Sequence, residues 1–139
     1  MTTSAPTPPG AQRWLENEPV IWMTTVRSDG QPQSSAVWFV YDEGAGFLIY
    51  SRRDAPRIAN IRRRPRVSLS AERKAGGEFV SVEGIAVVTE GPPSTAHVGY
   101  QTKYAKRIDT IGYTPQTFEA EYSLPIRVAP TRWRVFGVS

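Results

Sequence analysis

Proline and glycine interrupt this sequence so often that short strands are favoured over long helices. The 139 residues include 12 prolines and 11 glycines, and both residue types mark turns. Between the turns lie short runs in which apolar and polar residues alternate, which is the pattern of strands with one buried face. A mainly β fold with short helices is therefore expected, as a barrel of six to seven mostly antiparallel strands. The predicted strands cover residues 20–26, 33–41, 47–51, 66–71, 79–89, 126–128 and 133–138.

Local signals place the turns and the helices. The clusters Ser28-Asp29-Gly30 and 42–46 predict hairpin turns. Gly84 interrupts a long strand, where a bulge would bend the barrel wall. One short helix is predicted to start at Asp54 as its N-cap and to end before Pro65. The other predicted helices cover residues 10–16, 94–108 and 115–122.

The length suits a single domain. Residues 1–9 consist mainly of Thr, Ser, Ala and Pro, and such a tract buries too little to repay its ordering entropy. A disordered leader is expected at 1–9, with one barrel domain at 10–139. The longest apolar run, 36–41, is far too short to cross a bilayer, and the first residues lack the pattern of a signal peptide. A cytoplasmic protein without membrane contact is the expectation.

The residue inventory removes several kinds of chemistry. The chain has no cysteine, which excludes disulfides, thiolate metal sites and cysteine nucleophiles. Its single histidine, His97, leaves little material for a metal site or a catalytic triad, and we expect it on the surface or in a helix. No HExxH, GxSxG or Walker motif is present. A bound organic cofactor would supply the reactive atoms instead, and the protein would only have to hold it.

Positive charge is concentrated in one segment. Residues 51–74 hold nine basic and two acidic residues, an excess of seven positive charges, whereas the rest of the chain is net acidic. The junction 50–57 offers a hydroxyl, three guanidinium groups and the N–H groups of a helix start, which together suit a phosphate. The alternative is that these arginines are solvated surface residues, as we expect for Arg62, Arg63 and Arg64. Trp38, Phe39 and Tyr50 lie on adjacent predicted strands and could form an apolar slot.

Several runs resemble one known family. They are AVWFVYDEGAGF, FLIYSRRDAPRIANIRRRPRVSLS, VEGIAVV, YQTKYAKRI and GYTPQTFEAEYSLPIRVAPTRWRVF. Together they resemble the split β-barrel enzymes related to pyridoxamine 5′-phosphate oxidase, and within them the branch that uses the deazaflavin coenzyme F420 rather than FMN. The resemblance extends over about residues 14–136. It implies a split β-barrel homodimer with cofactor sites at the subunit interface, each built from both chains.

The resemblance also implies site residues. Arg57 stands where the family often has a lysine on the cofactor phosphate, and arginine keeps the charge. Two residues near the C-terminus match a region that often comes from the partner subunit. The full set of implied cofactor-binding residues is Val37, Trp38, Phe39, Tyr50, Ser51, Arg52, Arg57, Asn60, Arg132 and Trp133. Lys103 and Tyr104 are candidates for the substrate pocket or for proton donation, with a solvated helix as the alternative; no metal is expected.

Three functions remain open from the sequence. The first is transfer of a hydride from the reduced deazaflavin coenzyme to a small unsaturated organic acceptor. The second is an FMN-binding oxidoreductase or flavin-binding protein of the same fold. The deazaflavin coenzyme carries several negative charges along a longer path than FMN, so the local charge excess favours it. The third is a basic nucleic-acid-binding module, against which the net acidic remainder and the lack of a nucleic-acid motif both argue.

Overall fold

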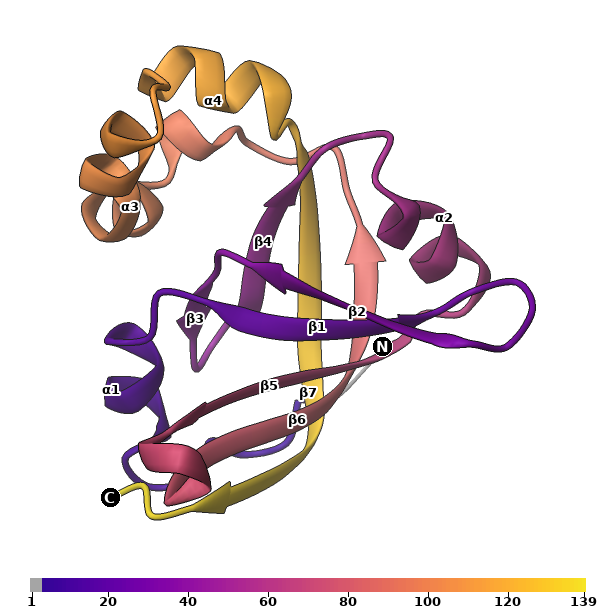
Figure 1. Cartoon of the computed structure of the whole chain (residues 1–139), viewed down its shortest axis with the longest axis vertical. Coiled ribbons are helices and arrows are strands. Elements are labelled where there is room, and N and C mark those ends of the chain that lie inside the picture. Colours follow the sequence, from indigo (N-terminus) through magenta and orange to yellow (C-terminus); the bar gives the residue numbers. More distant parts are fainter. Residues whose placement is uncertain (1–3) are drawn as a thin grey trace.

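The computed structural model describes residues 4–139, so the first three residues of the predicted leader lie outside the described part. Seven antiparallel strands form one sheet in the order β2-β1-β5-β6-β7-β4-β3. The sheet curls into a half-barrel with short helices around it (Figure 1). The predicted mainly β fold and its antiparallel pairing are confirmed. The strands are β1 (Ile21–Val26), β2 (Pro32–Val37), β3 (Val40–Asp42), β4 (Gly46–Ser51), β5 (Arg66–Arg73), β6 (Glu78–Val88) and β7 (Leu124–Phe136).

The single strand predicted at 33–41 is wrong. It is divided into β2 and β3, which lie at opposite edges of the sheet. Only Trp38 and Phe39 separate them, so the two edges of the sheet approach each other at this joint. The Phe39 N–H donates to the Tyr104 hydroxyl over 2.8 Å, and the Phe39 carbonyl accepts from the Lys103 ammonium over 2.9 Å. Side chains from a distant helix thus replace the ladder hydrogen bonds at the joint.

The two strands predicted at 126–128 and 133–138 are one continuous strand, β7. Its partner β6 shifts register between Glu83 and Gly84, which confirms the bulge predicted at Gly84. A Cβ on Gly84 would lie 2.6 Å from Val128 Cγ1, so glycine permits the close approach of the strands. Pro130 is tolerated because β4 pairs with β7 only over 124–128. Beyond that end, the Pro130 carbonyl accepts from Ala5 N–H over 2.8 Å.

Residues 4–9, the described part of the predicted leader, contact the barrel. Ala5 is bonded to β7, and the Thr7 hydroxyl contacts the Tyr41 hydroxyl. Polar side chains and backbone groups, rather than apolar burial, hold this segment against the barrel. The amino-acid composition of residues 1–9, which was the basis of the prediction, does not indicate such polar contacts.

The helices lie close to their predicted positions. They are α1 (Ala11–Glu16), α2 (Pro56–Arg63), α3 (Val98–Thr110) and α4 (Pro115–Glu121), with 3-10 turns η1 (Lys74–Gly76) and η2 (Ser94–Ala96). The N-cap of α2 is Ala55, not Asp54. The helix predicted from 94 is divided into η2 and α3, because His97 is in an extended conformation and caps α3. No helix in 4–139 is long and apolar enough to cross a membrane.

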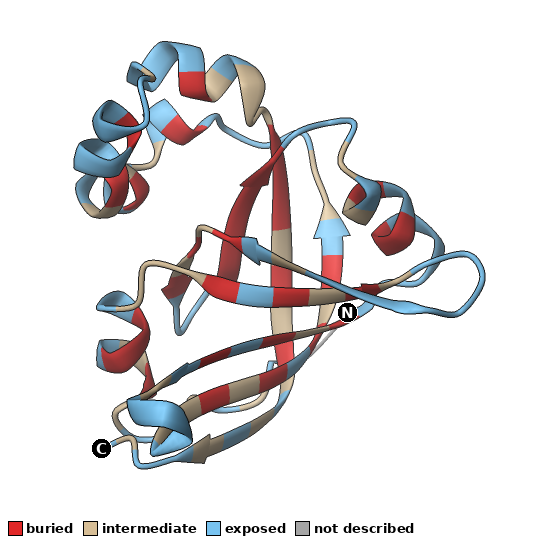
Figure 2. Cartoon of the chain, in the orientation of Figure 1, coloured by how far each residue is buried: buried red, intermediate tan, exposed pale blue. Residues whose placement is uncertain are grey.

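Two apolar clusters hold the fold together. One fills the barrel, and the other lies between the outside of β4 and the pair α3 and α4. Every residue of β4 is buried (Figure 2). Phe47 and Ile49 face the first cluster, whereas Leu48 and Tyr50 face the second. Apolar and polar residues do not alternate along β4, because both faces of the strand are covered.

Candidate functional site

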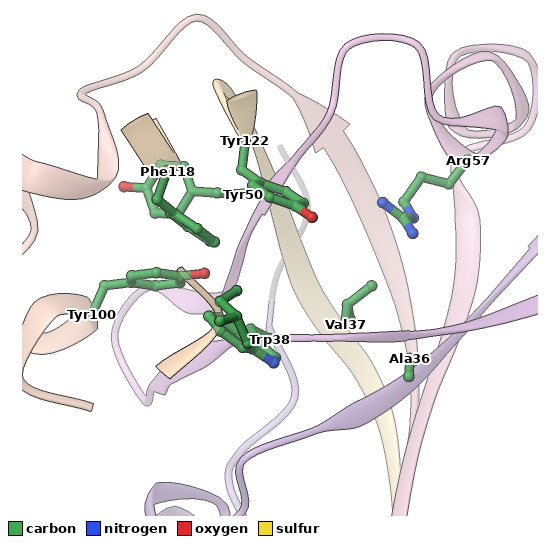
Figure 3. Close-up of a pocket in the computed structure, with 9 residues that line it drawn as sticks. Ala36, Val37, Trp38, Tyr50, Arg57, Tyr100, Phe118 and Tyr122 are labelled. Carbon is green, nitrogen blue, oxygen red and sulfur yellow. The ribbon is translucent and has the colours of Figure 1, made fainter. Parts of the chain in front are cut away.

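A cavity of about 220 Å³ lies between the N-terminal end of α2 and the helical pair α3 and α4. Its floor is the end of β2 and the joint that follows. Figure 3 shows aromatic side chains at one end of this cavity and the guanidinium of Arg57 at the other. The lining residues are Ala36, Val37, Trp38, Tyr50, Arg57, Tyr100, Ile111, Phe118 and Tyr122.

The aromatic end is built by rings that hold one another in place. The Trp38 indole stacks on Phe118, with ring centroids 5.6 Å apart and planes 15° from parallel. Phe118 stacks in turn on Tyr122 at 4.6 Å and 19°. Tyr50 meets Tyr100 edge to face at 4.9 Å. Such offset and edge contacts stabilise aromatic groups beyond simple burial, so the wall presents fixed π surfaces to any ligand in the cavity.

Arg57 supplies the charge at the other end. Its Nη1 donates to the Ser51 hydroxyl over 2.9 Å, and its Nη2 donates to the Ser35 hydroxyl over 3.2 Å. Its Nε is buried without a hydrogen-bond partner, and no carboxylate in the described chain forms an ion pair with it. Burial lowers the pKa of Arg57 from its ordinary value. A half-buried guanidinium without a counter-ion is an arrangement suited to an anionic ligand.

The neighbouring arginines are already occupied. Arg52 forms an ion pair with Glu121 at 2.8 Å and lies over the Tyr122 ring. Arg53 donates through two nitrogens to Glu90, at 2.9 and 2.7 Å. Of the three guanidinium groups that the sequence placed around the helix start, only Arg57 therefore has no carboxylate partner within residues 4–139. The charge that this junction leaves for an anion is therefore that of Arg57, which is supported by two serines.

The predicted cofactor residues divide into two groups. Val37, Trp38, Tyr50 and Arg57 line the cavity, and Ser51 adjoins it through its bond to Arg57. The others lie elsewhere within this chain, and Arg52 is held by Glu121 as described above.

Phe39 is fully buried in the barrel cluster. Asn60 is also buried, and its amide donates to the Thr25 hydroxyl over 3.0 Å and to the Gln33 side chain over 3.2 Å. Trp133 packs edge to face on Tyr41 inside the barrel. Arg132 is exposed on β7, opposite Glu83 of β6. These four residues support the walls around the cavity or lie away from it in the single chain.

Neither Lys103 nor Tyr104 lines the cavity. Lys103 donates to the carbonyls of Phe39 and Leu15 and lies 3.7 Å from the centre of the Phe39 ring. Burial lowers its pKa to about 8. The Tyr104 ring stacks on Trp38 at 4.8 Å with planes 2° apart, and burial raises its pKa. Both side chains hold the joint between β2 and β3, and Trp38 with it.

The sequence analysis missed several residues of the site. Ser35, Ala36, Tyr100, Phe118 and Tyr122 were not predicted as ligand-binding residues. Helical spacing was the available signal, because Tyr100 is four residues before Tyr104 and Phe118 is four residues before Tyr122. That spacing indicates a shared helix face but does not indicate what the face covers. His97, as expected, serves a helix: its Nδ1 accepts from Tyr100 N–H over 3.0 Å.

A second, smaller hollow of about 130 Å³ adjoins Arg57 from its other side. It is lined by polar side chains of β1 and β2, among them Gln33, Ser34 and Ser35, and by Pro56. Arg57 thus lies between an aromatic cavity and a hydroxyl-rich hollow. In residues 4–139, no group of three or more His, Asp or Glu side chains is placed to hold a metal ion.

Comparisons with known proteins identify relatives of this architecture. A family model described as pyridoxamine 5′-phosphate oxidase matches residues 7–136. No functionally curated protein matches the sequence. Among solved structures, an F420 reductase is similar with a TM-score of 0.73 and 24% identity, over 92% of this chain and 98% of that chain.

Two further solved structures share the fold. A conserved hypothetical protein from Mycobacterium tuberculosis has a TM-score of 0.73 and 21% identity, over 96% of this chain and 86% of its own. The heme storage protein HutZ from Vibrio cholerae has a TM-score of 0.67 and 16% identity, over 97% of this chain and 98% of its own. At these identities the structural likeness concerns the fold.

Proposed function

The chain belongs to the pyridoxamine 5′-phosphate oxidase family, and we propose that it is an oxidoreductase that holds the deazaflavin coenzyme F420 against Arg57. The reaction is reduction of a small unsaturated organic molecule. One observation carries the proposal: a half-buried guanidinium without a carboxylate partner lies at one end of a cavity walled by aromatic rings. A flavin-like cofactor combines an anionic tail with a flat ring, and these two features suit the two ends of the site.

The residues present fit such a group. Arg57, fixed by Ser51 and Ser35, would hold a phosphate, and its unpartnered buried Nε is an additional donor in the same guanidinium. Val37 and Trp38 would line the ring. When bound, the reduced coenzyme supplies a hydride, which no side chain can provide.

In the proposed reaction, this chain positions the reactants and excludes water from them. The rings of Trp38, Phe118 and Tyr122 keep water from the inner end of the cavity, and Arg57 fixes the depth at which an anionic ligand sits. Fixing two reactants in a dry site removes much of the entropic barrier to their reaction. Lys103 and Tyr104 act on the wall rather than on a ligand, since their polar atoms bond to the backbone.

We also propose a homodimer. The cavity of about 220 Å³ is smaller than the roughly 300 Å³ or more usual for cofactor sites, which supports completion of the site by a second chain. The outer face of the sheet exposes Trp22 and Phe136, at 53% and 60%, and such aromatic side chains favour an interface. Arg132 is exposed and free to reach across it, whereas Trp133 would first have to leave the barrel cluster.

FMN is the second candidate cofactor. It carries one terminal phosphate, and Arg57 is the one arginine at the helix start without a carboxylate partner in the described chain. The deazaflavin remains our choice because residues 51–74 carry an excess of seven positive charges, and the combined field of this segment favours the coenzyme with the longer and more negatively charged tail.

Titration of the purified protein with each coenzyme tests the choice. Trp38 lines the cavity, so quenching of tryptophan fluorescence reports binding. We expect the deazaflavin to bind at least about tenfold more tightly than FMN, with both affinities falling as salt screens the charges. Equal affinities, or tighter binding of FMN, would contradict the choice of the deazaflavin and would favour FMN as the cofactor. Light scattering at micromolar concentration tests the homodimer and should give about twice the chain mass. If the protein is a monomer and still binds the coenzyme, the proposal of a site shared between two chains is wrong.

A further inference from the structure

A groove of about 420 Å³ lies at the opposite end of α2 from the candidate site. Arg57 is the second residue of α2 and Arg63 is its last, so the two lie roughly 9 Å apart along the helix axis. No residue of the groove also lines the cavity or the smaller hollow beside Arg57. The lining residues of the groove are Val26, Arg63, Arg64, Pro65, Arg66 and Ile85.

The groove exists because β1 and β5 separate from each other. The two strands share only three residue pairs, in the first part of β1. Beyond these pairs, Val26 remains paired with β2, and Arg66 remains paired with Ile85 of β6. The Pro65 carbonyl accepts from Ala86 N–H over 2.8 Å, which holds the turn after α2 against β6. The space between the separating strands is therefore bounded by hydrogen-bonded backbone on both sides.

Aliphatic side chains form the floor of the groove. Val26, Pro65 and Ile85 supply them, and both Val26 and Ile85 are half-buried. Part of each side chain therefore stays in contact with water, and covering it with an apolar ligand is favourable. The volume of about 420 Å³ lies within the range of small-molecule sites, which starts at about 300 Å³.

Three arginines form the rim of the groove. Arg63, Arg64 and Arg66 are exposed, and no carboxylate in residues 4–139 forms an ion pair with them. Nη1 of Arg64 donates to the Arg27 carbonyl over 2.6 Å, which fixes this guanidinium beside the groove. The favourable interaction of a cation with a helix C-terminus accounts for Arg63. It does not account for Arg66, which belongs to β5.

The floor and the rim together specify the chemistry of a ligand. The forked donors of arginine match the oxygens of a phosphate. A phosphate monoester carries a charge of about −1.5 to −2 at pH 7, whereas a carboxylate carries a single charge, so three arginines favour the phosphate. The aliphatic floor requires the esterified group to be apolar. A bilayer surface suits the groove less well, because Val26 and Ile85 are half-buried and do not project as the apolar residues of a membrane-binding surface do.

We propose that this groove binds a free phosphate monoester with a single apolar chain. The phosphate lies against Arg63, Arg64 and Arg66, and the chain lies on Val26 and Ile85. The groove is a second binding site of the molecule, and neither its residues nor its ligand depend on the proposed coenzyme.

Isothermal titration with three probes tests the two halves of the site. Octyl phosphate carries both the head and the chain, inorganic phosphate carries the head alone, and 1-octanol carries the chain alone. Octyl phosphate should bind at least about tenfold more tightly than either of the others. This is the change expected of one charge-assisted hydrogen bond, or of a few buried methylene groups. An equal affinity for octyl phosphate and either comparator would overturn the proposal.

The same titration of Arg57→Ala locates the ligand, because Arg57 is the other group that we propose to hold a phosphate. Octyl phosphate should bind this variant within about twofold of the parent affinity. Loss of binding would place the ligand in the cavity and overturn the proposal. If octyl phosphate binds the parent and Arg57→Ala alike while neither coenzyme binds the parent, the groove stands and the proposed function fails.

A double variant, Arg63→Gln with Arg66→Gln, removes two charges from the rim. Both side chains are exposed and have no carboxylate partner in the described chain, so the fold should be kept. The affinity for octyl phosphate should fall at least about tenfold. Arg13→Gln with Arg107→Gln is the matched control, because these exposed arginines of α1 and α3 lie outside the groove; it should change the affinity by less than about twofold. Equal losses in the two folded double variants, or no loss in the first, contradict the proposal.

Ile85→Thr tests the floor. Threonine keeps a β-branched side chain in β6 and so suits the strand, but it replaces an apolar surface with a hydroxyl. The affinity for octyl phosphate should fall at least about threefold, whereas that for inorganic phosphate should not change. A variant that is folded by thermal unfolding and binds octyl phosphate as the parent does would show that the chain does not lie on this floor.

Sedimentation with vesicles of equal parts phosphatidylcholine and phosphatidylglycerol distinguishes a free ligand from a membrane. We expect octyl phosphate to bind in solution and the protein to stay in the supernatant. If the protein sediments with the vesicles, loses this with Arg63→Gln and Arg66→Gln, and does not prefer octyl phosphate over inorganic phosphate, the groove faces a membrane and the proposal is overturned.

Discussion

Substitution Arg57→Ala isolates the charge on which the proposed site depends. In the parent, the guanidinium is held by Ser51 and Ser35 and has no carboxylate partner among residues 4–139. Its lowered pKa reflects the unfavourable burial of its charge. Removing it therefore takes away a ligand-binding group without breaking an ion pair, and we expect the folding stability to be nearly unchanged.

The expected loss of affinity follows from the geometry. A charge-assisted hydrogen bond to phosphate contributes about 1.5–3 kcal/mol, and each 1.4 kcal/mol or so corresponds to about tenfold in affinity. Arg57→Ala should thus weaken coenzyme binding roughly ten- to a hundredfold. Arg57→Lys should recover part of the loss, because it restores the charge but not the forked donor geometry.

Two controls remove the same charge from the same segment. Arg53 is bonded to Glu90, and Arg63 is exposed on α2. Arg53→Ala and Arg63→Ala should each change the affinity by less than about threefold, because they alter only distant, screened charges. Fluorescence titration gives the affinities, and thermal unfolding checks the fold. Equal losses for Arg57→Ala and Arg63→Ala in folded proteins, or no loss for Arg57→Ala, would refute the assignment.

Three further predictions concern the framework that holds the site. Tyr104→Phe should lower the free energy of unfolding by about 1–3 kcal/mol in urea, because it leaves the buried Phe39 N–H without a hydrogen-bond partner; no change would show that the joint does not need this bond. Burial lowers the pKa of Lys103 to about 8 from 10.5, so across that pH window the unfolded chain binds more protons than the folded chain. The free energy of unfolding should therefore rise from pH 8 toward 10.5 through this group, and Lys103→Met should remove that rise in urea titrations at each pH. Gly46→Ala should destabilise more than Gly30→Ala in thermal unfolding, since both glycines have positive φ but only at Gly46 would a Cβ collide with the neighbouring strand; equal effects would contradict the close approach.

Alternation and turn signals were sufficient to predict most strands of the sheet. They failed where tertiary contacts replaced local ones. Residues 33–41 alternate as one strand, and nothing nearby in the sequence marks a break. The break at Trp38 and Phe39 exists because Tyr104 and Lys103, more than sixty residues later, bond to the Phe39 backbone. Conversely, Pro130 looked like an interruption of β7, but it lies beyond the part of β7 that pairs with β4. Its missing N–H therefore costs no hydrogen bond to β4.

The site could be predicted in part for the same reason. The charge of the junction 50–57 and the aromatic residues of the adjacent strand predicted a site at the place where this cavity lies, and Arg57 and Trp38 line the cavity. The sequence could not show which arginines were already paired, because the partners Glu90 and Glu121 lie far away along the chain. It also could not show that Tyr100 lines the cavity. Helical spacing indicates which residues share a helix face, but it does not indicate what packs against that face.

A crystal structure of this chain grown with the deazaflavin coenzyme tests the central claim most directly. The account predicts phosphate density within hydrogen-bond distance of the Arg57 guanidinium and ring density against Val37 and Trp38, in the cavity between α2 and the pair α3 and α4. Coenzyme bound elsewhere on the chain, with Arg57 still bonded only to Ser51 and Ser35, would contradict it.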